Sequence, residues 1–191
     1  IGDSTMANYA TDGTTDKRGW AQMLQQFFNV DNVTVNNRGK SGASSKSFYL
    51  ESAYWPTLVT GGSDAMQAGD FLLIQFAHND EKNGGADGDV VKEYYANQGD
   101  ATTAASTDYR GTTASGTYKE YIRKYIDEAK AMGVKPIVVG PICRKYFSTD
   151  GQSIKRNGMH DLGDNFTICD GTTLSTRNSV PASDDTYDYV A

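Results

Sequence analysis

The stretch from Phe71 to Phe76 constrains the fold most strongly, because it reads Phe-Leu-Leu-Ile-Gln-Phe and is almost continuously apolar. A strand with one face in water alternates apolar and polar side chains, whereas a strand covered on both faces is apolar throughout. The stretch therefore predicts a central strand of a parallel sheet. Val134 to Val139 predicts another buried strand, and the β-branched run Val33 to Val35 predicts a shorter one.

Two segments have the periodicity of amphipathic helices. Apolar residues recur at helical spacing from Trp20 to Phe28, which predicts a helix laid on the sheet. The same spacing from Tyr118 to Met132, followed by Gly133 as a C-cap, predicts a second one. The aromatic segment 47–58 is compatible with a helix broken at Pro56. Strands that alternate with helices in this way indicate an open α/β sheet with right-handed crossovers.

The chain has 191 residues, enough for one domain with its own core, and shows no internal repeat or interdomain linker. Residues 81–117 are rich in small and polar side chains, apart from a small cluster around Val90 and Tyr94. Connections of this length are usually functional lids or disordered segments. A solvated insertion is the alternative interpretation.

The net charge of −6 argues against binding to nucleic acid or to anionic membranes, and no apolar run approaches the ~18 residues of a membrane span. The expected partner is neutral or small. Cys143 and Cys169 either pair in a disulfide, as an oxidising compartment would allow, or remain free thiols. With so few His and Cys residues, neither a metal site nor a cofactor is expected.

Three short polar segments follow successive apolar runs: Gly2-Asp3-Ser4, a glycine-bearing loop around Gly42, and His78-Asn79-Asp80. Loops at the carboxyl ends of parallel strands meet in one crevice, so Ser4, Gly42 and Asn79 should converge. Acyl transfer needs a nucleophile, a base and donors for the oxyanion. The Ser4 hydroxyl can be the nucleophile, and the donors can be the Ser4 and Gly42 backbone N–H groups with the Asn79 amide. Taken singly, each residue more commonly caps a helix, makes a turn or bonds loop backbone.

This order of motifs resembles the SGNH (GDSL-type) hydrolases, and among them the rhamnogalacturonan acetylesterases. The resemblance implies a three-layer α/β/α sandwich with a parallel sheet of flavodoxin-like strand order, with Ser4, Gly42 and Asn79 at the family's oxyanion-hole positions. It also implies a secreted serine esterase that removes acetyl groups from plant cell-wall polysaccharide of the pectin, rhamnogalacturonan or xylan type.

The family's general base comes from an Asp-x-x-His pair near the C-terminus, and this sequence contains no such pair. We therefore expect residues 1–191 to form a single domain truncated at both ends, without its final strand, helix and histidine-bearing loop, and nearly inactive alone. Appended modules are also possible partners. The relatives commonly have arginines where Ala43 and Lys46 stand here.

The two histidines have different expected roles. His78 neighbours Asn79 in an extended segment, so the two point in opposite directions and His78 is expected to be structural. His160 lies in a loop that borders the substrate cleft in the relatives, and it is a candidate substrate contact. Asp3 and Asp80 are expected to brace the loops.

Two other motifs, the phosphate-binding loop of nucleotide-binding proteins and the serine motif of α/β-hydrolases, are absent from the sequence. A phosphate-binding loop ending at Gly39-Lys40-Ser41 would need glycine at position 34, which is Thr34, and no Gly-x-Ser-x-Gly occurs. A noncatalytic carbohydrate-binding module and an SGNH esterase acting on non-carbohydrate esters remain the alternatives.

Overall fold

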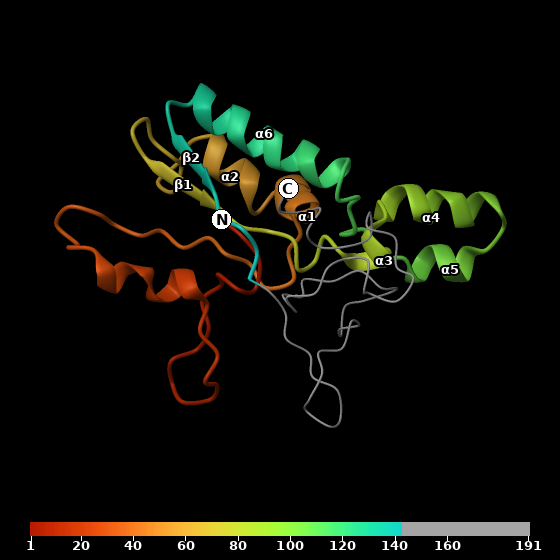
Figure 1. Cartoon of the computed structure of the whole chain (residues 1–191), viewed down its shortest axis with the longest axis horizontal. Helices are drawn as coiled ribbons and strands as arrows, with labels where there is room; N and C mark the ends of the chain where they lie inside the picture. The colour runs from red at the N-terminus through yellow and green to blue at the C-terminus, as the bar shows by residue number, and fades with distance from the viewer. Residues whose placement is uncertain (143–191) are drawn as a thin grey trace, which may run out of the picture.

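The computed structural model describes residues 1–142 of the chain. Figure 1 shows the helices α1, α2 and α6 on one side of the strands, η1 on the other side, and α3 to α5 at the far end from η1. The elements follow one another as η1 (Trp20–Phe27), α1 (Ser45–Leu50), α2 (Trp55–Val59), β1 (Phe71–Ile74), α3 (Lys82–Gly85), α4 (Gly88–Asn97), α5 (Ala101–Ser106), α6 (Thr117–Ala131) and β2 (Lys135–Val138).

The sheet is parallel, as predicted. Strands β1 and β2 pair in register from Phe71 opposite Lys135 to Ile74 opposite Val138. The N-terminal residues extend this sheet on the other side of β1, because the Ile1 nitrogen donates to Leu73 O at 2.8 Å and Gly2 forms a parallel bridge with Gln75. The expected α/β class with a parallel sheet is confirmed.

The loop around Lys40 lies next to the N-terminal residues. Its backbone N–H donates to Gly2 O at 2.8 Å, from the side of Gly2 that faces away from β1. The lateral order is therefore the loop at Lys40, residues 1–3, β1 and β2. If these four segments are numbered in the order in which they occur in the sequence, their order across the sheet is 2-1-3-4, which agrees with flavodoxin-type topology.

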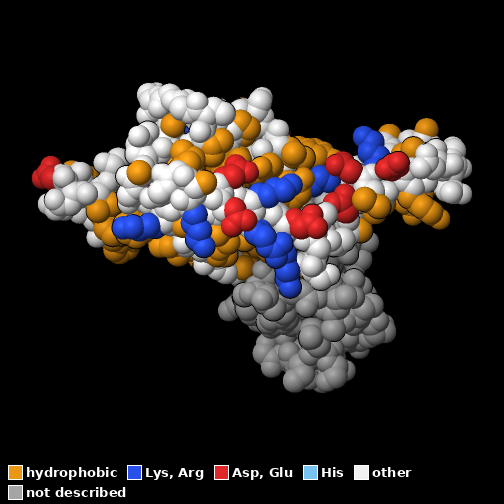
Figure 2. Space-filling model, turned by 90° about the horizontal axis from the view of Figure 1, so that it is seen from above, with side chains coloured by type: hydrophobic (Ala, Val, Ile, Leu, Met, Phe, Trp, Pro, Cys, Tyr) orange, Lys and Arg blue, Asp and Glu red, His pale blue; other side chains and the backbone are white. Residues whose placement is uncertain are grey.

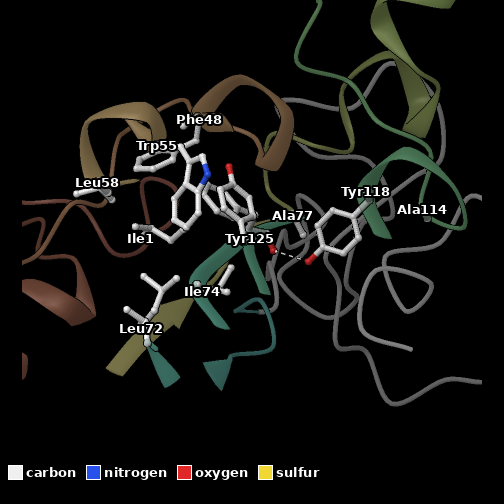
Figure 3. Close-up of a cluster of buried hydrophobic side chains, with 14 residues drawn as sticks. Ile1, Phe48, Trp55, Leu58, Leu72, Ile74, Ala77, Ala114, Tyr118 and Tyr125 are labelled. Carbon is white, nitrogen blue, oxygen red and sulfur yellow. Dashed lines mark hydrogen bonds between the residues drawn. The ribbon is translucent and has the colours of Figure 1, made fainter. Parts of the chain in front are cut away.

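The core lies between α6 and the sheet and is dominated by aromatic rings (Figure 3). Tyr125 is fully buried, with its ring 4.7 Å from Trp55 in an edge-on arrangement and 5.6 Å from Phe76 in a stacked one. Its hydroxyl donates to Ser45 O at 2.6 Å, so the polar end of the ring is satisfied. α6 ends at Ala131, and Gly133 follows its C-cap residue Met132 with a φ of +77°, the left-handed conformation that commonly terminates a helix.

Two predictions about the N-terminal half were wrong. Val33 to Val35 do not form a strand, because the Gln25 side chain bonds both Val33 O and Val35 N, two backbone groups that a neighbouring strand would otherwise pair. Trp20 to Phe27 form a 3-10 helix, and its apolar side is not laid on the sheet: Phe27 is 74% exposed and Met23 41%.

The predictions for β1 and β2 were only partly right, because both strands were expected to be buried, and β2 leaves Ile137 44% and Val138 50% exposed. One face of β1 is buried through Leu72 and Ile74, but Phe71 on the other face is 63% exposed. The helical segment 47–58 is also divided differently from expectation. It forms α1 and α2, and Pro56 lies in the first turn of α2, where its missing N–H costs nothing, instead of marking the break.

The segment 81–117, interpreted from the sequence as a lid, a disordered segment or a solvated insertion, contains α3, α4 and α5. Asp87 caps the N-terminus of α4 by accepting from Asp89 N and Val90 N, and Asp100 caps α5 by accepting from Thr103 N. The pair α4 and α5 forms a hairpin that extends from the body of the domain (Figure 1). Figure 2 shows hydrophobic side chains exposed on this hairpin, while acidic and basic side chains are interspersed over the middle of the same face.

Within residues 1–142, no helix has the length and apolar character needed to cross a bilayer. His160, Cys143 and Cys169 lie outside the described residues, so the substrate contact and the disulfide stay predictions.

Candidate active site

Ser4 lies in a tight turn directly after the N-terminal strand residues. Asp3 O accepts from Met6 N at 3.2 Å, and Asp3 Oδ1 accepts from the backbone and the hydroxyl of Thr5 at 2.9 and 2.8 Å. The Tyr9 hydroxyl fixes the turn further by donating to Ser4 O at 2.7 Å. The turn leaves Ser4 partly exposed at the carboxyl edge of the sheet, as predicted for a nucleophile.

Gly42 occupies a position that favours glycine. Its φ is +83°, a region that side chains with a Cβ rarely adopt, and an added Cβ would lie 3.2 Å from Arg110 Nη1. The Arg110 guanidinium donates to Gly42 O at 2.9 Å, which fixes the carbonyl on one side of the peptide. Gly42 therefore presents bare backbone at the edge of the sheet.

Asn79 follows β1 and is joined to the glycine loop. The side chain is buried, and Nδ2 donates one hydrogen bond to Ala43 O at 2.9 Å. A primary amide carries two hydrogens, so this bond orients the group and leaves the second N–H without an acceptor among residues 1–142. The structure thus joins two of the three predicted residues, Asn79 and Gly42, through Ala43.

Ser4 reaches the same edge through the backbone of its neighbours, since Gly2 is bonded to Lys40 and Asp3 N donates to Gln75 O at 3.3 Å. Within residues 1–142, the Ser4 and Gly42 backbone N–H groups have no acceptor, and no group is hydrogen-bonded to Ser4 Oγ. Three N–H donors that have no acceptor in the described part of the chain therefore belong to the loops that the sequence predicted would converge.

Asp80 braces these loops from behind, as expected. It is fully buried, accepts from Ser45 N at 3.0 Å, and also accepts from the hydroxyls of Ser45 and Thr112. Burial raises the pKa of Asp80 to about 7, against the opposing effect of the Ser45 and Thr112 hydrogen bonds and with a contribution from the charge of Asp3. Asp3 is likewise buried, and its Oδ2 has no hydrogen-bond partner in the described part of the chain.

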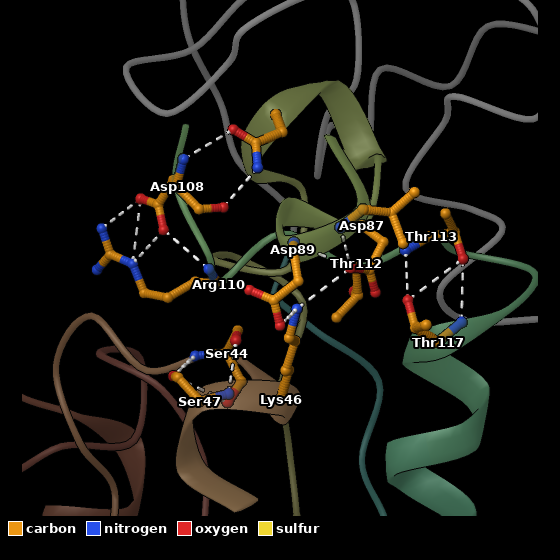
Figure 4. Close-up of polar contacts among 12 residues, drawn as sticks. Ser44, Lys46, Ser47, Asp87, Asp89, Asp108, Arg110, Thr112, Thr113 and Thr117 are labelled. Carbon is orange, nitrogen blue, oxygen red and sulfur yellow. Dashed lines mark hydrogen bonds and ion pairs between the residues drawn. The ribbon is translucent and has the colours of Figure 1, made fainter. Parts of the chain in front are cut away.

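Lys46 is buried in α1 and holds the helical hairpin against the glycine loop (Figure 4). Its ammonium lies 2.8 Å from Asp89 Oδ2 and 3.3 Å from Asp87 Oδ1. Burial disfavours the charged form, but the hydrogen bonds and charges of Asp89 and Asp87 outweigh it and raise the pKa of Lys46. The ion pairs therefore fix α4 to α1.

His78 is also buried, as a structural residue would be. Its Nε2 lies 2.5 Å from Ile142 O. A carbonyl oxygen can only accept, so Nε2 carries the hydrogen in this contact and is not the acceptor that a general base requires. The prediction that His78 is structural agrees with this geometry.

A cavity of about 380 Å³ adjoins Gly42, and sequence reasoning missed half of its wall. Besides the loop at Lys40 to Ala43, it is lined by residues 107–110 of the insertion and by Glu51 and Tyr54. Arg110 is fixed there by two bonds to Asp108, from Nε to Oδ1 at 2.9 Å and from Nη2 to Oδ2 at 2.6 Å. Arg110 lies 68 positions from Gly42, so no local pattern could have indicated the contact.

The described residues contain no group of three or more His, Cys, Asp or Glu side chains arranged to hold a metal ion.

A serine turn, a glycine loop and an asparagine after successive segments of a parallel sheet are the parts of a serine acylhydrolase site. The model of the GDSL-like lipase/acylhydrolase family matches residues 1–162, and the chain belongs to this family. Two curated relatives come from Bacillus subtilis strain 168. Rhamnogalacturonan acetylesterase RhgT is 28% identical over 79% of this chain, and the probable rhamnogalacturonan acetylesterase YesY is 27% identical over 76%.

The chain spans about half the length of these relatives, 51% of the first and 54% of the second. A crystal structure of the Bacillus subtilis protein YXIM superposes with a TM-score of 0.50 at 21% identity, covering 78% of this chain and 34% of that one. This likeness supports the fold alone.

Proposed function

We propose that residues 1–142 supply the nucleophile and the oxyanion hole of a carbohydrate acetylesterase. The observation that carries the proposal is that the Ser4 and Gly42 backbone N–H groups, one N–H of the Asn79 amide and the Ser4 hydroxyl have no hydrogen-bond partner within residues 1–142. Buried or half-buried donors are normally paired, so unpaired ones in loops that follow successive segments of a parallel sheet are best explained by an acceptor that arrives with the substrate.

The proposed reaction begins with attack of Ser4 Oγ on the acetyl carbonyl carbon. The carbonyl π electrons move to oxygen, and the three N–H groups stabilise that oxyanion, each by roughly 3 kcal/mol. Collapse of the tetrahedral intermediate expels the sugar oxygen, which takes up a proton. Water then hydrolyses the acetyl-serine and releases acetate.

A serine hydroxyl needs a base to remove its proton, and we place that base on polypeptide outside residues 1–142. The proposed substrate is acetylated rhamnogalacturonan or a related plant polysaccharide, because both curated relatives are named for that activity. Because such a polymer is found outside cells, we also propose that the protein is secreted.

The test uses the full-length protein with acetylated rhamnogalacturonan and with a chromogenic acetate ester, and measures released acetate. Ser4→Ala should abolish release from both. Ser63→Ala is the matched control, since Ser63 is an exposed serine in the loop before β1, far along the chain from the site. Activity that survives Ser4→Ala rules out Ser4 as nucleophile, and saccharide binding by the wild type without acetate release would favour the noncatalytic module.

A further inference from the structure

Residues 40–43 form a tight turn that sets the direction of the Gly42 N–H group. Ala43 N donates to Lys40 O at 3.1 Å and closes the turn, and Gly42, its third residue, has a φ of +83°. This combination is the signature of a type II turn, whose central peptide is rotated by roughly 180° from its direction in a type I turn. The Gly42 N–H belongs to that central peptide, so a change of turn type would present the Ser41 carbonyl in place of the donor.

The sequence of the turn does not lock this conformation, because glycine adopts positive and negative φ about equally readily. Contacts from outside the turn have to hold it. Lys40 N donates to Gly2 O at 2.8 Å on the entry side, and Ala43 O accepts from Asn79 Nδ2 at 2.9 Å on the exit side. Between them, Arg110 Nη1 donates to Gly42 O at 2.9 Å and holds the peptide that directly follows the central one.

Arg110 reaches Gly42 in a fixed orientation. Its Nε and Nη2 donate to the two carboxylate oxygens of Asp108 at 2.9 and 2.6 Å, which leaves Nη1 for the turn (Figure 4). The Asn83 side chain fixes Asp108 in turn, accepting from Asp108 N at 3.1 Å and donating to Asp108 O at 2.5 Å. Because a bidentate arginine–carboxylate pair is geometrically specific, the guanidinium is in place before any substrate arrives.

The same part of the insertion also holds the loop of the asparagine. Thr112 N donates to Asp80 O at 2.9 Å, and Asp80 directly follows Asn79. Residues 108–112 therefore connect the turn that carries the Gly42 donor to the loop that carries the Asn79 donor.

We propose that Arg110 is a positioning residue for the oxyanion hole, which keeps the Gly42 N–H directed at the substrate oxygen without touching the substrate. The inference rests on the proposed function. Donors that are already in place need no reorganisation when charge develops on the carbonyl oxygen, and a displacement of about 1 Å can lower the rate ~10²-fold. Loss of Arg110 should therefore lower kcat far more than it changes KM.

The test is steady-state kinetics of the full-length protein with a chromogenic acetate ester and with acetylated rhamnogalacturonan. Arg110→Met should lower kcat by about 10–100-fold for both substrates. The small ester does not extend along a polysaccharide site, so a residue that only contacts sugar would affect the polysaccharide alone. Arg110→Lys can still donate to Gly42 O and should keep more activity than Arg110→Met. Arg110→Ala should regain activity when guanidinium is added at concentrations that do not affect the wild type.

Arg38→Met is the matched control. Arg38 also pairs with an aspartate, Nη1 to Asp64 Oδ2 at 2.9 Å, and lies just before the turn, but within residues 1–142 it bonds no carbonyl of residues 40–43. This variant should keep the wild-type kcat for both substrates. Urea unfolding checks that each variant is folded in the assay, and Arg110→Lys tests the same claim if the methionine variant does not fold.

An unchanged kcat in the Arg110 variants, or a loss confined to the polysaccharide, would overturn this inference and leave the roles proposed for Ser4 and Asn79 standing. A wild type that releases no acetate from either substrate would instead overturn the proposed function, and this inference with it.

Discussion

Replacing Asp80 with asparagine should remove a pH dependence of folding stability that the buried carboxyl creates. The folded-state pKa is about 7 because burial disfavours the carboxylate, and the unfolded value is about 3.9. A carboxyl whose pKa is raised on folding binds more protons in the native state, so its contribution to stability is complete below about pH 4 and is lost as pH rises to about 7. A difference of about 3 pH units corresponds to a loss of at most about 4 kcal/mol.

The assay is urea unfolding at intervals from pH 4.5 to pH 8, with the free energy extrapolated to water. The wild type should lose stability across this range, whereas Asp80→Asn should follow a flatter curve. The amide mimics the neutral carboxyl, because its oxygen can still accept from Ser45 N and the hydroxyls of Ser45 and Thr112 can rotate to accept from its NH₂. Asp80→Asn should therefore be more stable than the wild type at pH 8.

Asp108→Asn is the control with the opposite sign. Burial disfavours the Asp108 carboxylate, but the hydrogen bonds and charge of Arg110 outweigh it and lower the pKa of Asp108. The stability from Asp108 is therefore present above about pH 4 and lost only in more acidic solution. This variant should shift the whole curve between pH 4.5 and 8 by a constant amount. A wild-type curve with the same slope as Asp80→Asn would refute the reasoning about Asp80.

Three further outcomes are expected. Lys46→Met should lower the free energy of unfolding by about 2 kcal/mol in urea titration, since it leaves Asp87 half-buried without its cation, and a loss below about 0.5 kcal/mol would contradict this. Gly42→Ala should cost about 1 kcal/mol because of its positive φ and the nearby Arg110 guanidinium, and a stability equal to wild type would show that the loop relaxes freely. Asn79→Ala should lower kcat for acetate release by about 10²–10³-fold with KM changed far less, and an unchanged kcat would exclude Asn79 from the oxyanion hole.

The sequence predicted where α6, β1 and β2 lie, and packing buries the apolar pattern of α6 and of one face of β1 but not that of β2, whose Ile137 and Val138 are 44% and 50% exposed. The tyrosines of α6 face the core, and β1 and β2 lie within two residues of their predicted limits. Val33 to Val35 failed because β propensity needs a neighbouring strand, and the Gln25 side chain occupies backbone groups that such a strand would pair.

The helices of the insertion could not have been found from periodicity, because they present little apolar surface to the core. Val90 and Tyr94 of α4 are 65% and 60% exposed. What fixes α4 is polar: the Asp87 cap within the segment and the ion pairs to Lys46, far away in sequence. The Asp87 cap was readable locally, but the ion pairs depend on the fold.

In the candidate site too, local sequence patterns indicated some of the residues, whereas others depend on contacts that exist only in the folded chain. Ser4, Gly42 and Asn79 could be singled out as candidates because turn chemistry at successive strand ends leaves a local signal, and their catalytic roles stay predictions. Asp80, too, was correctly predicted to brace the loops, through its bonds to Ser45 and Thr112. The role of Arg110 left no local signal, because its function depends on contact with Gly42.

The structure also bears on Ala43 and Lys46, the two positions at which the relatives commonly have arginines. Ala43 is 4% exposed, and its carbonyl orients Asn79, so its side chain has no access to a polysaccharide. Lys46 is 2% exposed and is committed to Asp87 and Asp89. Neither position can select a sugar here, whatever arginine would do in its place. Exchanging Lys46 for arginine should therefore leave the ratio of kcat/KM values for acetylated pectin-type and xylan-type substrates unchanged, and a shift in that ratio would show that α1 contributes to recognition after all.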